Sequence, residues 1–513
     1  MPGYKMKPKF KQMAFETAVR NPERYKKILS EVAEFEGCVL NDENLLKIVC
    51  KLAKAGIVTA RNLDLTSLSG KQLETAVINT NASRRADGGF PKGYPARFWT
   101  YMRTQCELGL VYATYNEEFK ISPIAHKMIE EELDEQTVFA NQSVIYNRRS
   151  PFRNVSNDFN YFRFIIEVLM ERWSHNKGLT MEQFILSMYS KDGNVNAFIN
   201  ELSNFHVSDL NETYEYLKTN YGETNEFTTV CKDYPDVVIR LLRITGFVTL
   251  KYVGKLIIQI NEDQIDYINK MFSYSYSFTV QEKEDRKLFY DKFLSFSSDL
   301  LEKTKSVVIS TTSIDYSSKL QGIIDTYNID LEKACELIDN IGTGSTMEAF
   351  KYVPEPIKLE FYITLLLFLK FGSSFNVKPN YKPDSFGLPI AQAPGGKGDI
   401  EVYSDSLYWL VEVTLIRNKN QQLNNETANL IRHLEEGTRQ GYLSLVAPVI
   451  HPDTITFFNN EIIGFLMKSK KVYLKPFSIS EFKDKTISGI VMEDIKTYTI
   501  NYIEAAKKAI LNS

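Results

Sequence analysis

The sequence predicts a multidomain α+β protein, in which a mainly helical, winged-helix-like region is followed by an α/β domain with a mixed sheet. Three observations support this prediction. The length of 513 residues fits several domains of roughly 100 to 200 residues each. Two N-terminal segments follow the order helix, hairpin, helix, and after residue 341 helices and strands alternate as αββαβαβ.

Composition excludes several classes of protein. Hydrophobic residues make up 43% and charged residues 24% of the chain, as in ordinary globular proteins. The longest apolar stretch, residues 361–371, is shorter than the roughly 18 residues that cross a bilayer, and the basic N-terminus is followed by no apolar segment, so a cytoplasmic protein is expected. Neither the five cysteines nor the five histidines cluster, which argues against disulfides and zinc sites.

The first helix-hairpin-helix segment starts at residue 94. Residues 94–108 have helical spacing, 109–114 and 119–121 are predicted strands, and Ser122-Pro123 is a typical helix start. The second segment has a helix over 237–244, strands over 246–250 and 256–260, and a helix starting at Asn261. A weaker repeat covers residues 45–60, where a helix precedes Gly56-Ile57-Val58. This order is that of a winged helix-turn-helix module, although αββα order is also common elsewhere.

Positive charge gathers in three places despite a net charge of −3. Residues 1–30 carry an excess of six positive charges, and the segments 82–103 and 147–153 combine Arg and Lys with Gly, Pro and aromatic residues. Such segments suit DNA phosphates and base edges, although a solvated charged loop is the simpler alternative. The residues expected to contact DNA are Arg84, Arg85, Lys92, Arg97, Arg103, Arg148 and Arg149.

Two carboxylates are expected to face one another on a hairpin in the last domain. Residues 399–403 and 408–415 alternate as strands around a short turn. A four-residue loop would fix three cross-strand pairs: Tyr403–Tyr408, Ile400–Val411 and Asp399–Glu412. Because opposed carboxylates repel one another, a divalent cation is the simplest remedy, and oxygen ligands favour Mg²⁺ over zinc.

Two further acids flank this hairpin. Glu360 lies near the start of an apolar helix over 357–371, where the helix dipole alone could explain a carboxylate. Glu426 lies on the flank of a predicted helix that follows the hairpin. Buried strands are then expected over 442–450 and 472–477, with a helix starting at Pro452. The loop 394–398 lacks the Ser/Thr and the following helix of a phosphate loop, so no nucleotide is expected.

This element order, with an Asp after a Gly-rich loop and Glu-x-Thr one strand later, resembles the PD-D/ExK nuclease core. The segments Pro394-Gly395-Gly396-Lys397-Gly398-Asp399-Ile400-Glu401-Val402-Tyr403 and Leu410-Val411-Glu412-Val413-Thr414 are similar to the nuclease motif of the AlwI family of type IIS restriction endonucleases, which includes a nicking enzyme. The resemblance implies a Mg²⁺-dependent enzyme that cuts outside a short asymmetric DNA site.

The resemblance also assigns residues. It implies that Asp399 and Glu412 hold metal and that Glu360 and Glu426 are further catalytic acids. Thr414 stands where a Lys is usual in the general nuclease pattern, so Lys397 or a water on the metal would have to take over part of its work.

The resulting domain prediction has four parts: DNA-recognition domains over 1–155 and 156–277, a helical linker over 278–340, and the nuclease domain over 341–513. Cutting both strands would need a second copy or a partner subunit, since one set of acids is visible. Two other functions stay open: a winged-helix DNA-binding regulator with an inactive nuclease-like domain, and an end-processing nuclease of transposition or recombination.

Overall fold

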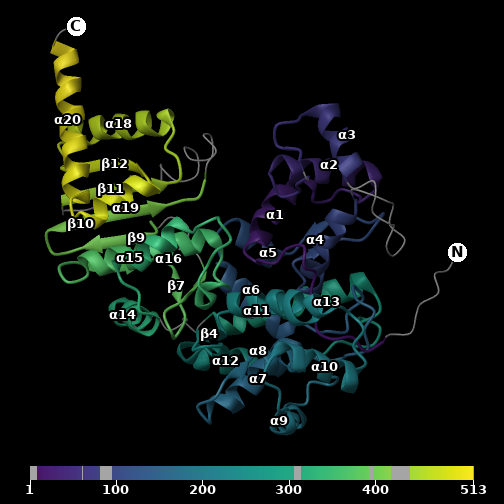
Figure 1. Cartoon of the computed structure of the whole chain (residues 1–513). Helices are drawn as coiled ribbons and strands as arrows, with labels where there is room; N and C mark the ends of the chain where they lie inside the picture. The colour runs from purple at the N-terminus through teal and green to yellow at the C-terminus, as the bar shows by residue number, and fades with distance from the viewer. Residues whose placement is uncertain are drawn as a thin grey trace. The chain divides into compact units, whose positions relative to one another are not determined.

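The chain divides into two compact units, Met1–Thr311 and Thr312–Ser513 (Figure 1). The structure is a computed structural model and describes residues 9–60, 62–80, 95–305, 314–391, 398–416 and 440–511. None of the helices within these ranges combines the length and the apolar content that crossing a bilayer requires.

The first unit is mainly helical. Its helices are α1 Arg24–Val32, α2 Asp42–Lys54, α3 Gly70–Thr80, α4 Pro95–Glu107, α5 Pro123–Ile129, α6 Glu135–Ile145, α7 Tyr161–Trp173, α8 Met181–Ser187, α9 Val195–Asn204, α10 Leu210–Tyr221, α11 Tyr234–Ile244, α12 Ile265–Phe272 and α13 Arg286–Thr304. Its strands are β1 Val111–Tyr112, β2 Lys120–Ile121, β3 Leu179–Thr180, β4 Val248–Tyr252 and β5 Leu256–Ile260.

Both predicted helix-hairpin-helix segments are present. In the first, α4 leads into the antiparallel pair β1–β2, and α5 starts at Ser122, whose hydroxyl accepts a hydrogen bond from the Ala125 amide as an N-cap. In the second, α11 leads into the antiparallel pair β4–β5, to which β3 adds a third strand, and α12 follows. The order of elements expected from the sequence is therefore confirmed in both segments.

The weaker repeat at residues 45–60 is not a third copy. The helix α2 is present, but the structure assigns no strand to residues 56–58. Gly56 adopts a left-handed backbone with φ of 71°, and the amides of Ile57 and Val58 both donate to the Leu52 carbonyl. These amides close the end of the helix, so they cannot join a strand ladder.

The second unit is an α/β structure around a five-stranded mixed sheet. Its elements are α14 Tyr316–Tyr327, α15 Leu331–Asp339, α16 Glu355–Phe371, β6 Asn376–Pro379, β7 Lys382–Pro383, β8 Pro389–Ala391, β9 Ile400–Tyr403, β10 Leu407–Val413, β11 Gln440–Ala447, α18 Pro452–Met467, β12 Val472–Ser478, α19 Ile479–Ile487 and α20 Val491–Leu511. The strand order is β12-β11-β10-β9-β6, in which β10, β11 and β12 are parallel to one another, and β9 is antiparallel to both β10 and β6.

The expected order αββαβαβ is wrong in one respect that matters for the site. An extra strand, β6, precedes the hairpin and pairs with β9 at the edge of the sheet. It is only four residues long and ends at Pro379, which an edge strand tolerates because it needs no inward-facing amide there. The helices α19 and α20 after β12 were also not expected.

The hairpin has the predicted register. Tyr403 pairs with Tyr408 and Ile400 with Val411. Trp409 points toward the side of α16 and α19, since its ring lies 6.2 Å from that of Phe371 and 5.9 Å from that of Phe482. The opposite face is not simply polar, because Leu410 is buried in a cluster with residues of β11, β12 and α18. Figure 1 shows α18 and α20 next to β12 on this sheet.

Candidate functional site

The acids of the predicted site lie where β9 begins and β10 ends. The register Ile400–Val411 brings the preceding residue, Asp399, beside Glu412. The Asp399 amide donates to Glu412 Oε2 over 3.3 Å, and the Val413 amide donates to Asp399 Oδ2 over 2.8 Å. The two carboxylates are thus adjacent and held in place by backbone donors.

Asn380, directly after β6, holds the backbone around Asp399. Its own amide donates to the Asp399 carbonyl over 2.8 Å. Its side-chain amide donates to the Gly398 carbonyl over 2.6 Å and to Glu401 Oε1 over 2.8 Å. Lys378 Nζ also contacts Glu401 Oε1, at 3.3 Å. Asn380, which is 8% exposed, therefore holds the carbonyl groups of both Gly398 and Asp399.

Sequence reasoning missed Asn380 and Lys378 because it missed β6. The alternation of exposed and buried side chains in that strand is the one signal available, and four residues with a terminal Pro are too few to stand out. Gly398 also matters for packing, because a Cβ added there would lie 2.4 Å from Leu410 Cδ1. A real Cβ at that distance would displace either Leu410 or the chain leading into Asp399.

Glu360 lies close to this pair from α16. It is 4% exposed, and its Oε1 is buried without a hydrogen-bond partner among the described residues. Burial, and then the neighbouring Asp399 carboxylate, raise the pKa of Glu360 well above its ordinary range. Glu360 is the sixth residue of α16, beyond the first turn in which the helix dipole acts, so the dipole does not explain this carboxylate.

Two tyrosines complete the surroundings of Glu360. Burial, then Glu401, then Glu360 raise the pKa of Tyr316. Burial, then Glu360, raise the pKa of Tyr381, whose hydroxyl is buried without a partner in the described part of the unit. Both hydroxyls therefore stay protonated in the neutral range and lie near the acids without adding charge.

The donor set fits an oxygen-seeking cation. Asp399 and Glu412 supply carboxylate oxygens, and the buried, unpaired Oε1 of Glu360 is a third oxygen nearby. In the ranges that the structure covers, no three or more His, Cys, Asp or Glu side chains form a group that could hold a metal ion. The first ligands would accordingly be the Asp399–Glu412 pair. Glu426 and Lys397 lie outside the described residues.

Thr414 occupies the position at which the nuclease pattern usually has a Lys. It is 7% exposed, and its hydroxyl accepts a hydrogen bond from the Ile416 amide over 3.1 Å. This side chain therefore caps the end of the strand and carries no charge into the site.

The residues predicted to contact DNA lie in different environments. Arg84, Arg85 and Lys92 lie outside the described residues. Arg97 and Arg103 are on α4, and Arg103 pairs with Glu16 at 2.6 Å. Arg149 lies 3.6 Å from Asp158 and 3.7 Å from Glu284.

Arg148 is not a surface contact, contrary to the picture of a basic loop over residues 147–153. It is 2% exposed, and its two terminal nitrogens donate to the carbonyls of Ala14 and Gln12 over 3.1 and 2.7 Å. A guanidinium can satisfy several backbone carbonyls at once, which is why Arg rather than Lys suits this buried position.

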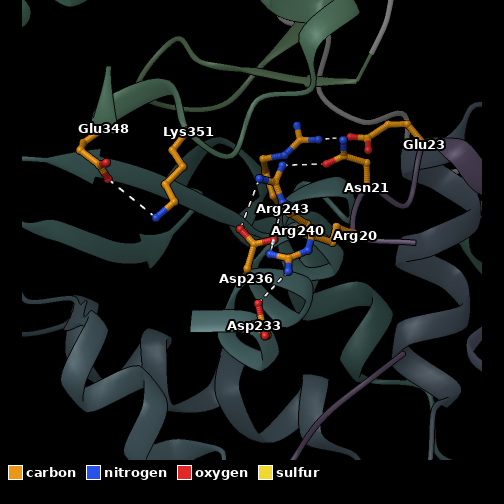
Figure 2. A network of polar contacts seen from close by, with 9 residues as sticks. All are labelled: Arg20, Asn21, Glu23, Asp233, Asp236, Arg240, Arg243, Glu348 and Lys351. Atoms are coloured by element: carbon orange, nitrogen blue, oxygen red, sulfur yellow. Dashed lines mark hydrogen bonds and ion pairs between the residues drawn. The ribbon is translucent and has the colours of Figure 1, made fainter. Parts of the chain in front are cut away.

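Part of the N-terminal positive charge is also paired within the first unit. Arg20 contacts Asp233 at 2.6 Å, just before α11. Asn21 accepts a hydrogen bond from Arg240 of α11, and Glu23 pairs with Arg243 of the same helix (Figure 2). These residues, within the basic segment 1–30, therefore tie it to the first helix of the second helix-hairpin-helix segment.

Comparison with known proteins identifies the family. The model of the AlwI restriction endonuclease family matches residues 106–355 and 345–484, which together exceed half of the chain. The chain belongs to the AlwI restriction endonuclease family. The match begins within α4 of the first helix-hairpin-helix segment, covers the second segment in full, and includes the hairpin that carries Asp399 and Glu412.

The comparisons with solved structures and with curated proteins give less information than the family model. The AlwI-family chain is similar to the small subunit of the heterodimeric restriction endonuclease R.BspD6I, with 24% identity over 34% of this chain and 96% of that chain and a TM-score of 0.26. It is also similar to the BpuJ1 endonuclease binding domain in complex with modified DNA, with 13% identity over 54% of this chain and 91% of that chain and a TM-score of 0.33. No curated protein matches the chain.

Proposed function

We propose that this AlwI-family protein is a Mg²⁺-dependent, sequence-specific type IIS endonuclease or nicking enzyme, which hydrolyses phosphodiester bonds a short distance outside an asymmetric site. Membership of a restriction endonuclease family makes it a DNA endonuclease. The finer assignment is supported chiefly by one observation: Asp399 and Glu412 are adjacent at one end of the hairpin and are each contacted by a backbone amide.

The second unit would supply the chemistry. Its order α16, β6, β9, β10 and β11, with Asp399 before β9 and Glu412 on β10, supports a PD-D/ExK core. Asp399 and Glu412 would hold Mg²⁺, and Glu360 and Glu426 would be the further acids. When bound, Mg²⁺ neutralises the charge that develops on the phosphodiester and lowers the pKa of the water that it binds.

The chain's own groups have separate tasks in this proposal. The Val413 amide fixes the orientation of Asp399, and the Asp399 amide fixes that of Glu412. Burial and the neighbouring Asp399 raise the pKa of Glu360, so this side chain can keep a proton until a cation favours its charged form. The buried Thr414 supplies no positive charge, so the work of the usual Lys falls to another group.

The first unit would recognise DNA. Its two helix-hairpin-helix segments support winged-helix modules, and Arg97, Arg103 and Arg149, with Arg84, Arg85 and Lys92 of the preceding loop, are the proposed contacts. One set of acids cuts one strand at a time. Cleavage of both strands would then require transient dimerisation on DNA or a second subunit.

Supercoiled plasmid incubated with Mg²⁺, followed by run-off sequencing of the products, tests the proposal. A fixed offset from a short site is expected. No cutting would favour a DNA-binding regulator with an inactive nuclease-like domain, and ends at particular DNA structures would favour an end-processing nuclease.

The matched variants are Asp399→Asn and Glu412→Gln. Each keeps an oxygen that can accept the observed backbone hydrogen bond, and each removes one negative charge. Both should abolish cleavage and leave duplex affinity near that of the wild type. Loss of affinity in parallel with activity would contradict the assignment of these residues to the metal.

A further inference from the structure

A cavity of about 510 Å³ in the first unit brings together basic residues from three separate parts of the sequence. It is lined by Lys11 of the N-terminal segment, Arg103 of α4, and Arg148 and Arg153 of the segment 147–153. These are the three basic segments that the sequence marks as candidate DNA contacts. The lining also includes Tyr221, which is the last residue of α10, the following residues 222–225, and Tyr234 of α11.

The cavity has an excess of positive charge. Four cationic side chains line it, against the two acids Glu16 and Glu223. Glu223 is already occupied by donors: Thr224 and Asn225 amides bind its Oε1 over 2.7 and 2.6 Å, and the Tyr189 hydroxyl binds its Oε2 over 2.5 Å. Glu223 therefore offers little to the arginines across the cavity.

The buried arginines are incompletely satisfied. Arg148 uses both terminal nitrogens on backbone carbonyls, and its Nε has no hydrogen-bond partner among the described residues. Arg153 Nε pairs with the buried Glu107, but its Nη2 lies 4.0 Å from Glu16 and makes no hydrogen bond within the described ranges. The Gln12 side-chain nitrogen beside them likewise has no partner there. Each of these three atoms is a donor, so three buried donors at the cavity have no acceptor within the described ranges, where Oε2 of the neighbouring Glu107 also has no partner.

The rim of the cavity is accessible. Lys11 is exposed, and its amide donates a hydrogen bond to Asn157 Oδ1. The side chain of Arg103 is 42% exposed where it pairs with Glu16. An excess of positive charge on low-dielectric walls raises the positive potential in a cleft, so this opening favours an anion.

We infer that this cavity binds a phosphate group of a DNA strand, with Lys11 and Arg103 as the direct contacts at the rim and the charges of Arg148 and Arg153 behind them. The inference rests on the proposed function, because it takes DNA as the source of the phosphate. A backbone phosphate carries no base information, so this site would fix the position of the strand and would not select its sequence. Free phosphate has the same chemistry and is the alternative source.

The test measures binding of the full-length chain to a labelled duplex by fluorescence anisotropy, in EDTA, over a range of KCl concentrations. Lys11→Ala and Thr224→Glu should weaken binding to every duplex several-fold, and Lys11→Ala should reduce the slope of log affinity against log salt by about one. Thr224→Lys should tighten binding. The Thr224 side chain is exposed at the cavity, which allows both signs of charge to be tested at one position.

Lys47→Ala on α2 is the matched control, because Lys47 is also an exposed lysine but does not line the cavity. It should leave affinity and slope unchanged. Neutral methylphosphonates placed singly along the duplex should identify one phosphate whose neutralisation weakens the wild type but not Lys11→Ala.

Two results would overturn the inference. The first is that Lys11→Ala and Thr224→Glu both bind DNA with wild-type affinity. The second is that inorganic phosphate stabilises the wild type against heat and Thr224→Glu removes this stabilisation but keeps wild-type DNA affinity, since the site would then bind a free anion. Failure of the wild type to bind any duplex is a different result, which would refute the proposed function itself.

Discussion

Replacing Asn380 with Ala should separate the structural and functional roles of the polar residues around Asp399. The substitution removes one hydrogen bond to the Gly398 carbonyl and one to the Glu401 carboxylate. A neutral hydrogen bond contributes about 0.5–1.5 kcal/mol and one to a charged group about 1.5–3 kcal/mol, so the free energy of unfolding should fall by about 2–4.5 kcal/mol. Urea denaturation of the full-length chain measures this change.

The functional consequence should exceed the fraction of protein that unfolds. Without the Asn380 side chain, the Gly398 carbonyl loses its anchor beside Asp399, so the cleavage rate per folded molecule should fall and the Mg²⁺ concentration for half-maximal rate should rise. Duplex affinity in EDTA should not change, because the first unit is untouched. Asn376→Ala, at the exposed start of the same strand, is the control. Wild-type rate and Mg²⁺ dependence in folded Asn380→Ala would show that Asn380 only stabilises the sheet.

Three other changes should have distinct effects. Gly398→Ala should lower both stability and cleavage, because the added Cβ would lie 2.4 Å from Leu410 Cδ1; a fully active, stable variant, assayed by plasmid cleavage and urea unfolding, would refute this packing argument. Burial raises the pKa of Glu135 to about 7, so the folded state holds this proton more tightly than the unfolded state does. The stability that results is lost as the pH rises from the ordinary pKa of 4.5 through about 7. Glu135→Gln should therefore remove about 2–3 kcal/mol of the loss in unfolding free energy between pH 5 and pH 8, and an unchanged pH profile would contradict the shift. Arg97→Ala should relax specificity at one base pair at a cost of about 1–3 kcal/mol, measured against a panel of single-base site variants; equal weakening on every duplex would make Arg97 a phosphate contact instead.

The hairpin formed by β9 and β10 could be predicted from the sequence because its physical constraints are strong. A slip of one residue would move Trp409 from the apolar side, where it meets Phe371 and Phe482, to the other face of the sheet. The short turn then fixes which residues pair, and the pairing brings Asp399 beside Glu412. Local pattern and burial agree here, so sequence alone was enough.

The strand β6 could not be predicted in the same way. It is four residues long, it ends in Pro379, and it gains its place in the sheet from pairing with β9, which is distant in sequence. Its contribution to the site, Asn380 and Lys378, followed from that long-range pairing. The strand predicted at the end of the repeat over residues 45–60 is wrong because a local pattern was misleading. Gly56 closes a helix, and the short apolar segment after it only resembles a strand.

A basic cluster in a sequence does not show which of its Arg residues contact groups inside the fold. Arg148 is directed at backbone carbonyls inside the unit, and Arg20 pairs with Asp233 before α11. Nothing in the local sequence distinguishes these residues from Arg97 or Arg103. Arg103 pairs with Glu16 and Arg148 with carbonyls, and both also line the cavity of the first unit, so the fold determines the partners of each guanidinium and a charge pattern indicates only a region.

The acidic residues of the second unit raise the reverse question of how the chain tolerates them together. Asp399, Glu412 and Glu401 lie near one another, with Lys378 paired to Glu401 and an uncharged Thr414 directly after β10. Like charges at such separations destabilise a fold unless protons, donors or cations reduce the repulsion. Burial favours the protonated form of Glu360, and backbone amides donate to Asp399 and Glu412. These measures reduce the repulsion between carboxylates whose oxygens are of the kind that an oxygen-seeking cation prefers as ligands.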